Sequence, residues 1–223
     1  MGKICIIIFI VFIFNGCSKS LDDLNTTNKL FEFAININEE KEAYQYGDTL
    51  WIETEINSAY SDYSTDQDVS INNASVLISC AVNKLYSNID SLYFIDSNFN
   101  IIIENGRLEL INVIDNEQTS YIFDVRYGLP FNSNKLKVGL ILSFPGTFAI
   151  TASGKVFYGE NRTDSNDLTG KDEVADVNYI FNVENVNKTI FDNLPTNEYN
   201  YFKNIYTESI INSKQVYFID IKN

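Results

Sequence analysis

Runs in which apolar and polar residues alternate recur along this chain, and they limit its fold more than any other feature. In "LFEFAININ", residues 30–38, every second residue is large and apolar. Successive side chains of a β-strand point to opposite faces, so a period of two predicts a strand with one buried face. The residues expected on the buried face are Phe31, Phe33, Ile35 and Ile37.

The stretch "TLWIETEI", residues 49–56, repeats the pattern after the turn signal Gly47-Asp48. Its inward positions are Leu50, Ile52 and Ile56, and its outward positions are Trp51, Glu53 and Glu55. Further strands are expected near residues 75–85, 121–127, 136–143, 147–158 and 177–183, with a loop over 57–73. Asn105-Gly106 lies between two apolar runs, and Asn-Gly tolerates the positive φ angles of a two-residue turn. It therefore predicts a β-hairpin.

Many short strands separated by turn signals predict an all-β fold, specifically an antiparallel β-sandwich over residues 30–186. The early stretch "GDTLWIE" and the late stretch "PGTFAIT" resemble bacterial immunoglobulin-like domains, in which such stretches form the second and penultimate strands. That resemblance implies an immunoglobulin-like sandwich and says nothing of function.

The tail after Pro195 changes period. Tyr199, Phe202, Ile205 and Tyr206 are spaced at helical intervals, which predicts a single amphipathic helix. The run "KQVYFIDI" that follows predicts a closing strand. Residues 187–223 are therefore expected to form a short helix and a strand that pack on the sandwich.

The N-terminus has the composition of a signal peptide. One positive charge, Lys3, precedes an apolar run from Ile4 to Phe14, which as a helix covers roughly half of a hydrocarbon core about 30 Å thick. Gly16 and Cys17 then resemble the end of a bacterial lipoprotein lipobox, whose cysteine receives the lipid. The resemblance implies cleavage after residue 16, lipid attachment at Cys17, and a polar tether over residues 17–29.

The same resemblance implies a location. The stretch "SKSLDD" after Cys17 resembles the charged export signals of surface lipoproteins in Bacteroidota, which favours the outer membrane and leaves open the leaflet. Two or more acyl chains anchor a protein stably, so the chain is expected to meet its membrane through N-terminal acyl chains. A net charge of −14 argues against nucleic acid as a partner, because phosphate backbones bind clustered Lys and Arg.

Histidine is absent from the chain, which excludes Ser-His-Asp triads, Cys-His pairs and HExxH zinc sites. None of the ten glycines falls in a GxGxxG or GxxxxGK[ST] pattern, so no cofactor is expected. Carboxylate chemistry remains as an alternative, since a glycoside hydrolase needs only two suitably spaced acids. No particular pair stands out, and we expect a protein that is not an enzyme.

Two acidic loops contain oxygen ligands of the kind that Ca²⁺ prefers, one around Asp62 and Asp66 and one around Asp164. Neither follows the EF-hand order, so solvated loops without metal are expected and calcium binding stays open. Cys80 is expected to be a small buried side chain.

Aromatic side chains in polar surroundings are the remaining candidates for a ligand face: Trp51, Tyr60 and Tyr63. Flat rings beside hydrogen-bonding groups can stack on sugars or anchor a protein partner. The leading hypothesis is an outer-membrane lipoprotein with a protein-interaction or accessory role in the envelope, and it predicts an exposed apolar patch near the tail helix. A glycan-binding module is the alternative, and it predicts these rings together on one open face.

Overall fold

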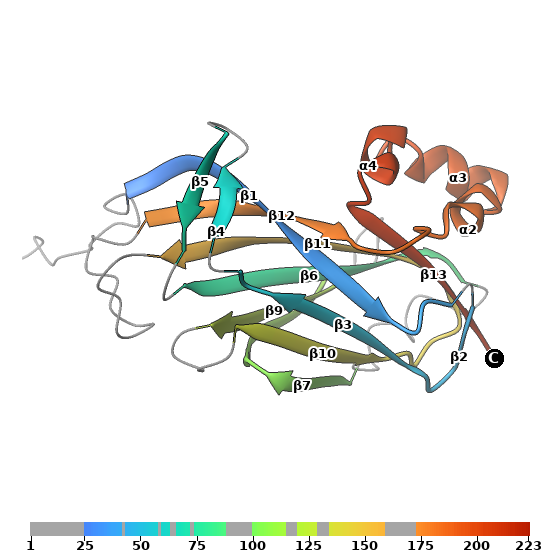
Figure 1. The fold of residues 1–223 in the computed structure, drawn as a ribbon. Coiled ribbons are helices and arrows are strands. Elements are labelled where there is room, and N and C mark those ends of the chain that lie inside the picture. Colours follow the sequence, from blue (N-terminus) through green and yellow to red (C-terminus); the bar gives the residue numbers. More distant parts are fainter. Residues whose placement is uncertain are drawn as a thin grey trace, which may run out of the picture.

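The structure is a computed structural model that describes residues 25–41, 43–57, 59–62, 66–71, 74–87, 100–114, 120–128, 134–158 and 173–223. The predicted signal peptide, Cys17, Tyr63 and the acidic loop around Asp164 lie outside these residues. The prediction of an all-β fold is confirmed, because strands dominate and the helices are short (Figure 1).

Along the described chain, the strands of the first half are β1 (Asn25–Asn38), β2 (Tyr44–Gln45), β3 (Thr49–Glu55), β4 (Ala59–Asp62), β5 (Gln67–Ser70) and β6 (Ser75–Tyr86). Those of the second half are β7 (Ile101–Asn105), β8 (Arg107–Ile114), β9 (Ser120–Gly128), β10 (Lys135–Ile141), β11 (Gly146–Tyr158), β12 (Glu173–Phe181) and β13 (Val216–Lys222). Between β12 and β13, the described chain contains three helices: α2 (Lys188–Asp192), α3 (Thr196–Phe202) and α4 (Glu208–Asn212).

The main sheet follows the order β7-β10-β3-β1-β12-β11-β6-β9-β8, and it curls so that β3 and β10 face β6 and β9 across one core (Figure 1). It is nearly barrel-shaped. The prediction that all pairs are antiparallel is wrong, because β1 runs parallel to β12 and β13 runs parallel to β2. The first of these pairs joins chain segments that are far apart in sequence, so no local turn sets its direction.

The two ends of this path, β7 and β8, are consecutive in the chain and meet at Gly106. The predicted hairpin at Asn105-Gly106 is wrong, because β7 pairs with β10 whereas β8 pairs with β9. Gly106 has φ +107° and a Cβ there would lie 2.7 Å from the carbonyl oxygen of Arg126. Glycine thus makes a corner at which the chain passes from one half of the sheet to the other.

The predicted inward faces of the two N-terminal strands are confirmed. Phe31, Phe33 and Ile35 of β1 are fully buried, and so is Leu50 of β3. β1 begins at Asn25, within the segment that was expected to be a tether, and Asn25 pairs with Glu173 of β12. The alternation becomes visible only from residue 30, so a strand start in the polar residues before it could not be read from periodicity.

The C-terminal segment packs on the sheet through β13, whose two faces are both covered. Phe218 stacks on Phe191 of α2 with ring centroids 4.9 Å apart, while Tyr217 faces inward and stacks on Phe181. The single predicted helix is wrong, because α3 ends at Phe202 and α4 starts after Thr207, whose side chain accepts a hydrogen bond from the Ile210 amide. None of the helices in the described part of the chain is long and apolar enough to cross a membrane.

Candidate functional site

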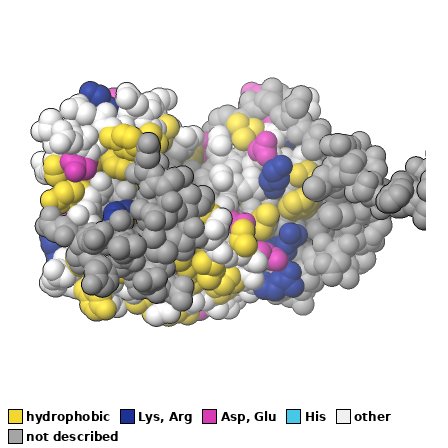
Figure 2. Space-filling view, turned by 180° about the vertical axis from the view of Figure 1, so that it is seen from behind, with side chains coloured by type: hydrophobic (Ala, Val, Ile, Leu, Met, Phe, Trp, Pro, Cys, Tyr) yellow, Lys and Arg dark blue, Asp and Glu magenta, His cyan; other side chains and the backbone are white. Residues whose placement is uncertain are grey.

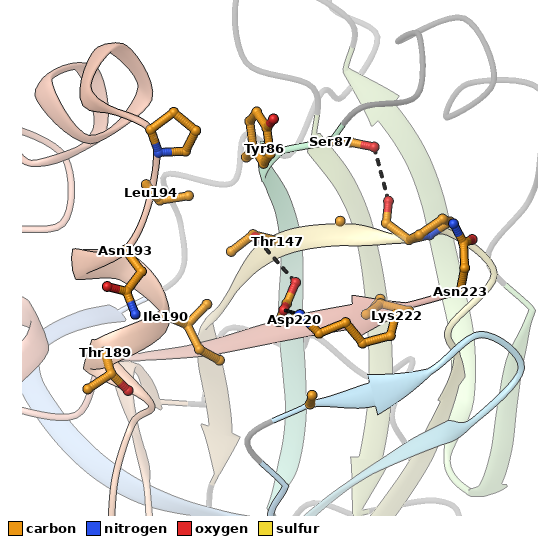
Figure 3. A pocket seen from close by; sticks show the side chains of 15 residues that line it. Tyr86, Ser87, Thr147, Thr189, Ile190, Asn193, Leu194, Asp220, Lys222 and Asn223 are labelled. Atoms are coloured by element: carbon orange, nitrogen blue, oxygen red, sulfur yellow. Dashed lines mark hydrogen bonds and ion pairs between the residues drawn. The ribbon is translucent and has the colours of Figure 1, made fainter.

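A hollow of about 770 Å³ lies where α2 meets the ends of β11 and β13 (Figure 3). Ile190 and Leu194 form its helical side, and Thr147, Asp220 and Lys222 line the sheet side. Some of the polar groups that line the hollow bond to one another. Thr147 Oγ1 donates to Asp220 Oδ1 at 3.4 Å, and Lys222 forms an ion pair with the same carboxylate.

A polar group on the rim of the hollow also has a partner already, since Ser87 Oγ donates to the carbonyl oxygen of Pro145 at 3.0 Å. A ligand entering the hollow would therefore have to compete with existing bonds at each of these polar groups, and each net gain would be small. The hollow lies near the tail helices, and the charged side chains Asp220 and Lys222 in its lining are occupied with each other.

Trp51 points outward from β3, as the alternation predicts. It pairs with Asn38 of β1 on one side and with Gly139 of β10 on the other. A Cβ at Gly139 would lie 2.9 Å from Cζ3 of the indole and 3.0 Å from Cη2. The indole therefore lies against the backbone of β10, in space that a side chain at position 139 would enter.

Charged and amide groups surround this ring. The ammonium of Lys137 lies 4.6 Å from the centroid of Trp51, 3.2 Å from Glu104 Oε2 and 3.8 Å from Glu53 Oε1. The Asn38 side chain donates to Glu53 Oε1 at 2.6 Å. Around the indole, donors and acceptors thus alternate within short distances, on side chains that stay at least partly exposed.

Tyr60 does not join this face. Its ring stacks on Phe33 with centroids 4.4 Å apart, and its hydroxyl donates to the carbonyl oxygen of Glu55 and accepts from the Asn57 amide. Phe33 points into the core, whereas Trp51 points to the opposite side of the same sheet region. Tyr60 thus attaches the β4–β5 hairpin to the core, and its role as part of the predicted ligand face gains no support from this position.

Strand β8 is an edge strand with an unusual surface. All six residues from Arg107 to Asn112 are exposed, and three of them are large aliphatic side chains. Their exposed fractions are 36% for Leu108, 51% for Leu110 and 43% for Ile111. Together with Ile102 of β7, they make up most of the exposed large hydrophobic side chains among the described residues.

A bulge divides β8 into two parts. The register with β9 shifts between Leu108 and Leu110, and Glu109 at the bulge binds both Arg107, at 2.7 Å, and Arg126, at 3.2 Å. Beyond the bulge, residues 110–114 pair regularly with β9 on one side and carry no charge. In the view from behind, hydrophobic side chains lie among basic and acidic ones on the described surface (Figure 2).

The remaining chemically notable side chains are buried. Desolvation, together with the smaller effect of the Asp124 carboxylate, raises the pKa of Cys80 to about 12. Desolvation also raises the pKa values of the buried tyrosines Tyr44, Tyr127, Tyr179 and Tyr217. These groups stay protonated at neutral pH, and neither the thiol nor the phenols can serve as nucleophiles there. Across the described ranges, no group of three or more acidic or cysteine side chains is placed to hold a metal ion.

Comparisons with known proteins add little. No protein-family model matches the chain, and no curated protein matches it. Among solved structures, the human F-spondin reeler domain (fragment 1) is 14% identical, with a TM-score of 0.26, over 72% of this chain and 93% of that one. A likeness at that level supports no conclusion about the activity of this chain.

Proposed function

We propose that this chain is a non-enzymatic lipoprotein of the bacterial outer membrane with a protein-interaction or accessory role in the envelope. Acyl chains on Cys17 would hold it on the membrane, and the edge of β8 would bind the partner protein. The observation that carries this proposal is the exposed aliphatic edge strand, Leu108 to Ile111, at the end of the main sheet.

An edge strand presents a row of backbone N–H and C=O groups to which an extended segment of another protein can add. Proteins normally protect such edges with Lys, Pro, bulges, inward charges or a covering element. The bulge of β8 lies before residue 110, and the stretch "LINVI" beyond it, residues 110–114, contains no charge and no proline. Its composition therefore fits an edge that is covered when the protein is assembled with its partner.

The position of this surface differs from the expected one. The hypothesis predicted an apolar patch near the tail helix, and Tyr201 and Ile205 are indeed exposed there, at 45% and 39%. The larger group of exposed aliphatic side chains lies on β7 and β8 instead. Backbone pairing adds to side-chain contact only at a strand edge, so β8 is the better candidate.

The immunoglobulin-like assignment belongs to the same proposal. Two facing parts of one curled sheet around a single core support it. The carboxylate-hydrolase alternative stays a prediction, because no observation favours a particular pair of acids.

A crosslinking experiment in cells of the source bacterium tests the proposed function. A photoreactive amino acid replaces Asn112, which is exposed in β8, and adducts are identified in the envelope fraction. We expect one specific protein adduct, because a strand added to β8 would lie against this position. An adduct at twice the mass of the chain would identify the partner as a second copy.

Two variants show whether the adduct depends on the edge surface. Leu110→Lys places a charge on the edge, opposite Asp124 of β9, and should abolish the adduct, because lysine on an edge strand opposes strand addition. Tyr46→Lys changes a large hydrophobic side chain elsewhere that is 61% exposed, and should leave the adduct intact. Both sites are largely exposed, so each variant should change the free energy of unfolding by less than about 1 kcal/mol. The absence of any protein adduct, or an adduct indifferent to Leu110→Lys, would contradict the proposal.

A further inference from the structure

We infer that the outward face of β3 and β10 around Trp51 is a binding site for a neutral glycan. This site is separate from the β8 edge and does not depend on the function proposed for it. It rests on three features of the described residues: the position of the indole, the charged groups around it, and the balance of those charges.

The indole packs over a glycine. Gly139 is buried in the interior of β10, and a Cβ there would lie 2.9 Å from Cζ3 of the ring and 2.9 Å from Cγ2 of Thr49. Inside a strand, glycine is less stabilising than alanine. At this position the glycine leaves room for the indole to lie against the sheet, where it makes an aromatic floor on an outward face.

The side chains around the floor can both donate and accept hydrogen bonds. Lys137 and Asn38 are donors, and Glu53 and Glu104 are acceptors. Their exposed fractions are 30% for Lys137, 36% for Glu53 and 46% for Glu104. Ion pairs at such exposure contribute little to stability, so the hydroxyl groups of a ligand can replace them at low cost.

The charges select the class of ligand. One ammonium between two carboxylates leaves the site slightly negative, and the whole chain carries −14, so an anionic ligand is disfavoured. A cationic ligand would meet the Lys137 ammonium, which already lies over the ring. An apolar ligand would remove the ion pairs from water without replacing their hydrogen bonds.

A neutral sugar avoids all three penalties. Its C–H face can stack on the indole once Lys137 turns toward Glu104, and its hydroxyls can donate to Glu53 and accept from Asn38. Hydroxyls both donate and accept, which matches the alternation around the ring. The inferred ligand is therefore an uncharged oligosaccharide.

Trp51 is the sole tryptophan of the chain, so tryptophan fluorescence reports on this site alone. The full chain, in a detergent without a sugar headgroup, is titrated with gluco-, manno-, galacto- and N-acetylglucosamine oligosaccharides and with polygalacturonate. We expect a saturable change in emission with at least one neutral oligosaccharide, and at least tenfold weaker binding of polygalacturonate. A flat response to all four neutral series up to 10 mM would overturn the inference.

Two glutamates on the outward face of β3 provide matched variants. Glu53→Ala removes an acceptor beside the indole and should weaken sugar binding at least tenfold. Glu55→Ala removes a carboxylate that pairs instead with Lys135, at 3.2 Å, and should change binding less than twofold. Trp51→Ala, followed by calorimetry because the fluorophore is lost, should abolish binding. Equal binding by the Glu53 and Glu55 variants would contradict the assignment of this face.

Discussion

Replacement of Gly106 by alanine should destabilise the fold far more than the small size of the change suggests. Gly106 has φ +107°, and an added Cβ would lie 2.7 Å from the Arg126 carbonyl oxygen and 3.1 Å from Cδ1 of Leu136. The oxygen belongs to the backbone of β9, which is paired on both sides by β6 and β8 and cannot shift freely. The alanine would therefore bring both backbone strain and a steric clash.

Gly47 separates these two effects. It also has a positive φ, +90°, but a Cβ there would meet nothing within 4 Å. Strained backbone at either position costs about 1–3 kcal/mol, and forcing an atom into packed space at Gly106 adds about 1–3 kcal/mol. We expect a loss of about 4 kcal/mol in the free energy of unfolding for Gly106→Ala and about 2 kcal/mol for Gly47→Ala.

Thermal unfolding followed by circular dichroism measures the difference. For a chain of this size, each kcal/mol shifts Tm by about 2–4 °C, so we expect a decrease of roughly 10 °C for Gly106→Ala and roughly 5 °C for Gly47→Ala. Urea unfolding at 25 °C should give the same order. If the two variants were equally stable, the corner at Gly106 would not be as tight as described, and the closure of the sheet there would be in doubt.

Three further predictions concern cysteine and tyrosine side chains. Cys17→Ser should remove the acyl chains, and membrane fractionation should find the chain no longer bound to the outer membrane; retention there would contradict lipid attachment at Cys17. Burial raises the pKa of Cys80 to about 12, so iodoacetamide at pH 8 should modify Cys80 only in urea, as mass spectrometry can show. The third prediction concerns four buried tyrosines, Tyr44, Tyr127, Tyr179 and Tyr217. Because burial raises the pKa values of these tyrosines in the folded chain, their contribution to the free energy of unfolding is fully present below pH 10. It is lost above pH 10, where the tyrosines of the unfolded chain ionise first. Above pH 10 the free energy of unfolding, measured in urea, should fall by up to about 5 kcal/mol per pH unit. Absorbance at 295 nm should show these tyrosines ionising together with unfolding.

The sequence predicted local features of this fold well because period-two alternation is a property of each strand by itself. The positions of most strands and the outward direction of Trp51 follow from that alternation alone. The alternation does not indicate which strands pair with one another. Gly139 lies under Trp51 only because β10 pairs with β3 in one register, and nothing in either stretch specifies that register to a reader of the sequence.

Two of the wrong predictions share a physical cause, because in each of them tertiary packing overrode a local signal. Asn105-Gly106 has the composition of a hairpin turn, yet β7 pairs with β10 and β8 pairs with β9 instead of with each other. Tyr199 and Tyr206 have helical spacing, yet Tyr199 contacts Phe191 from α3 whereas Tyr206 contacts it from the segment that follows α3. The sequence does contain a signal for the break between α3 and α4, because Thr207 followed by Glu208 is typical of a helix N-terminus.

On the proposed function, a partner protein in the envelope covers the edge of β8. Hydrogen exchange can test this, by comparing amides of residues 110–114 in isolated outer membranes and in the purified chain. The amides that do not bond to β9 should exchange slowly in native membranes and rapidly in the purified chain, with β6 in the core unchanged as the internal reference. Equal exchange of these amides in both samples would contradict the proposed role of the β8 edge.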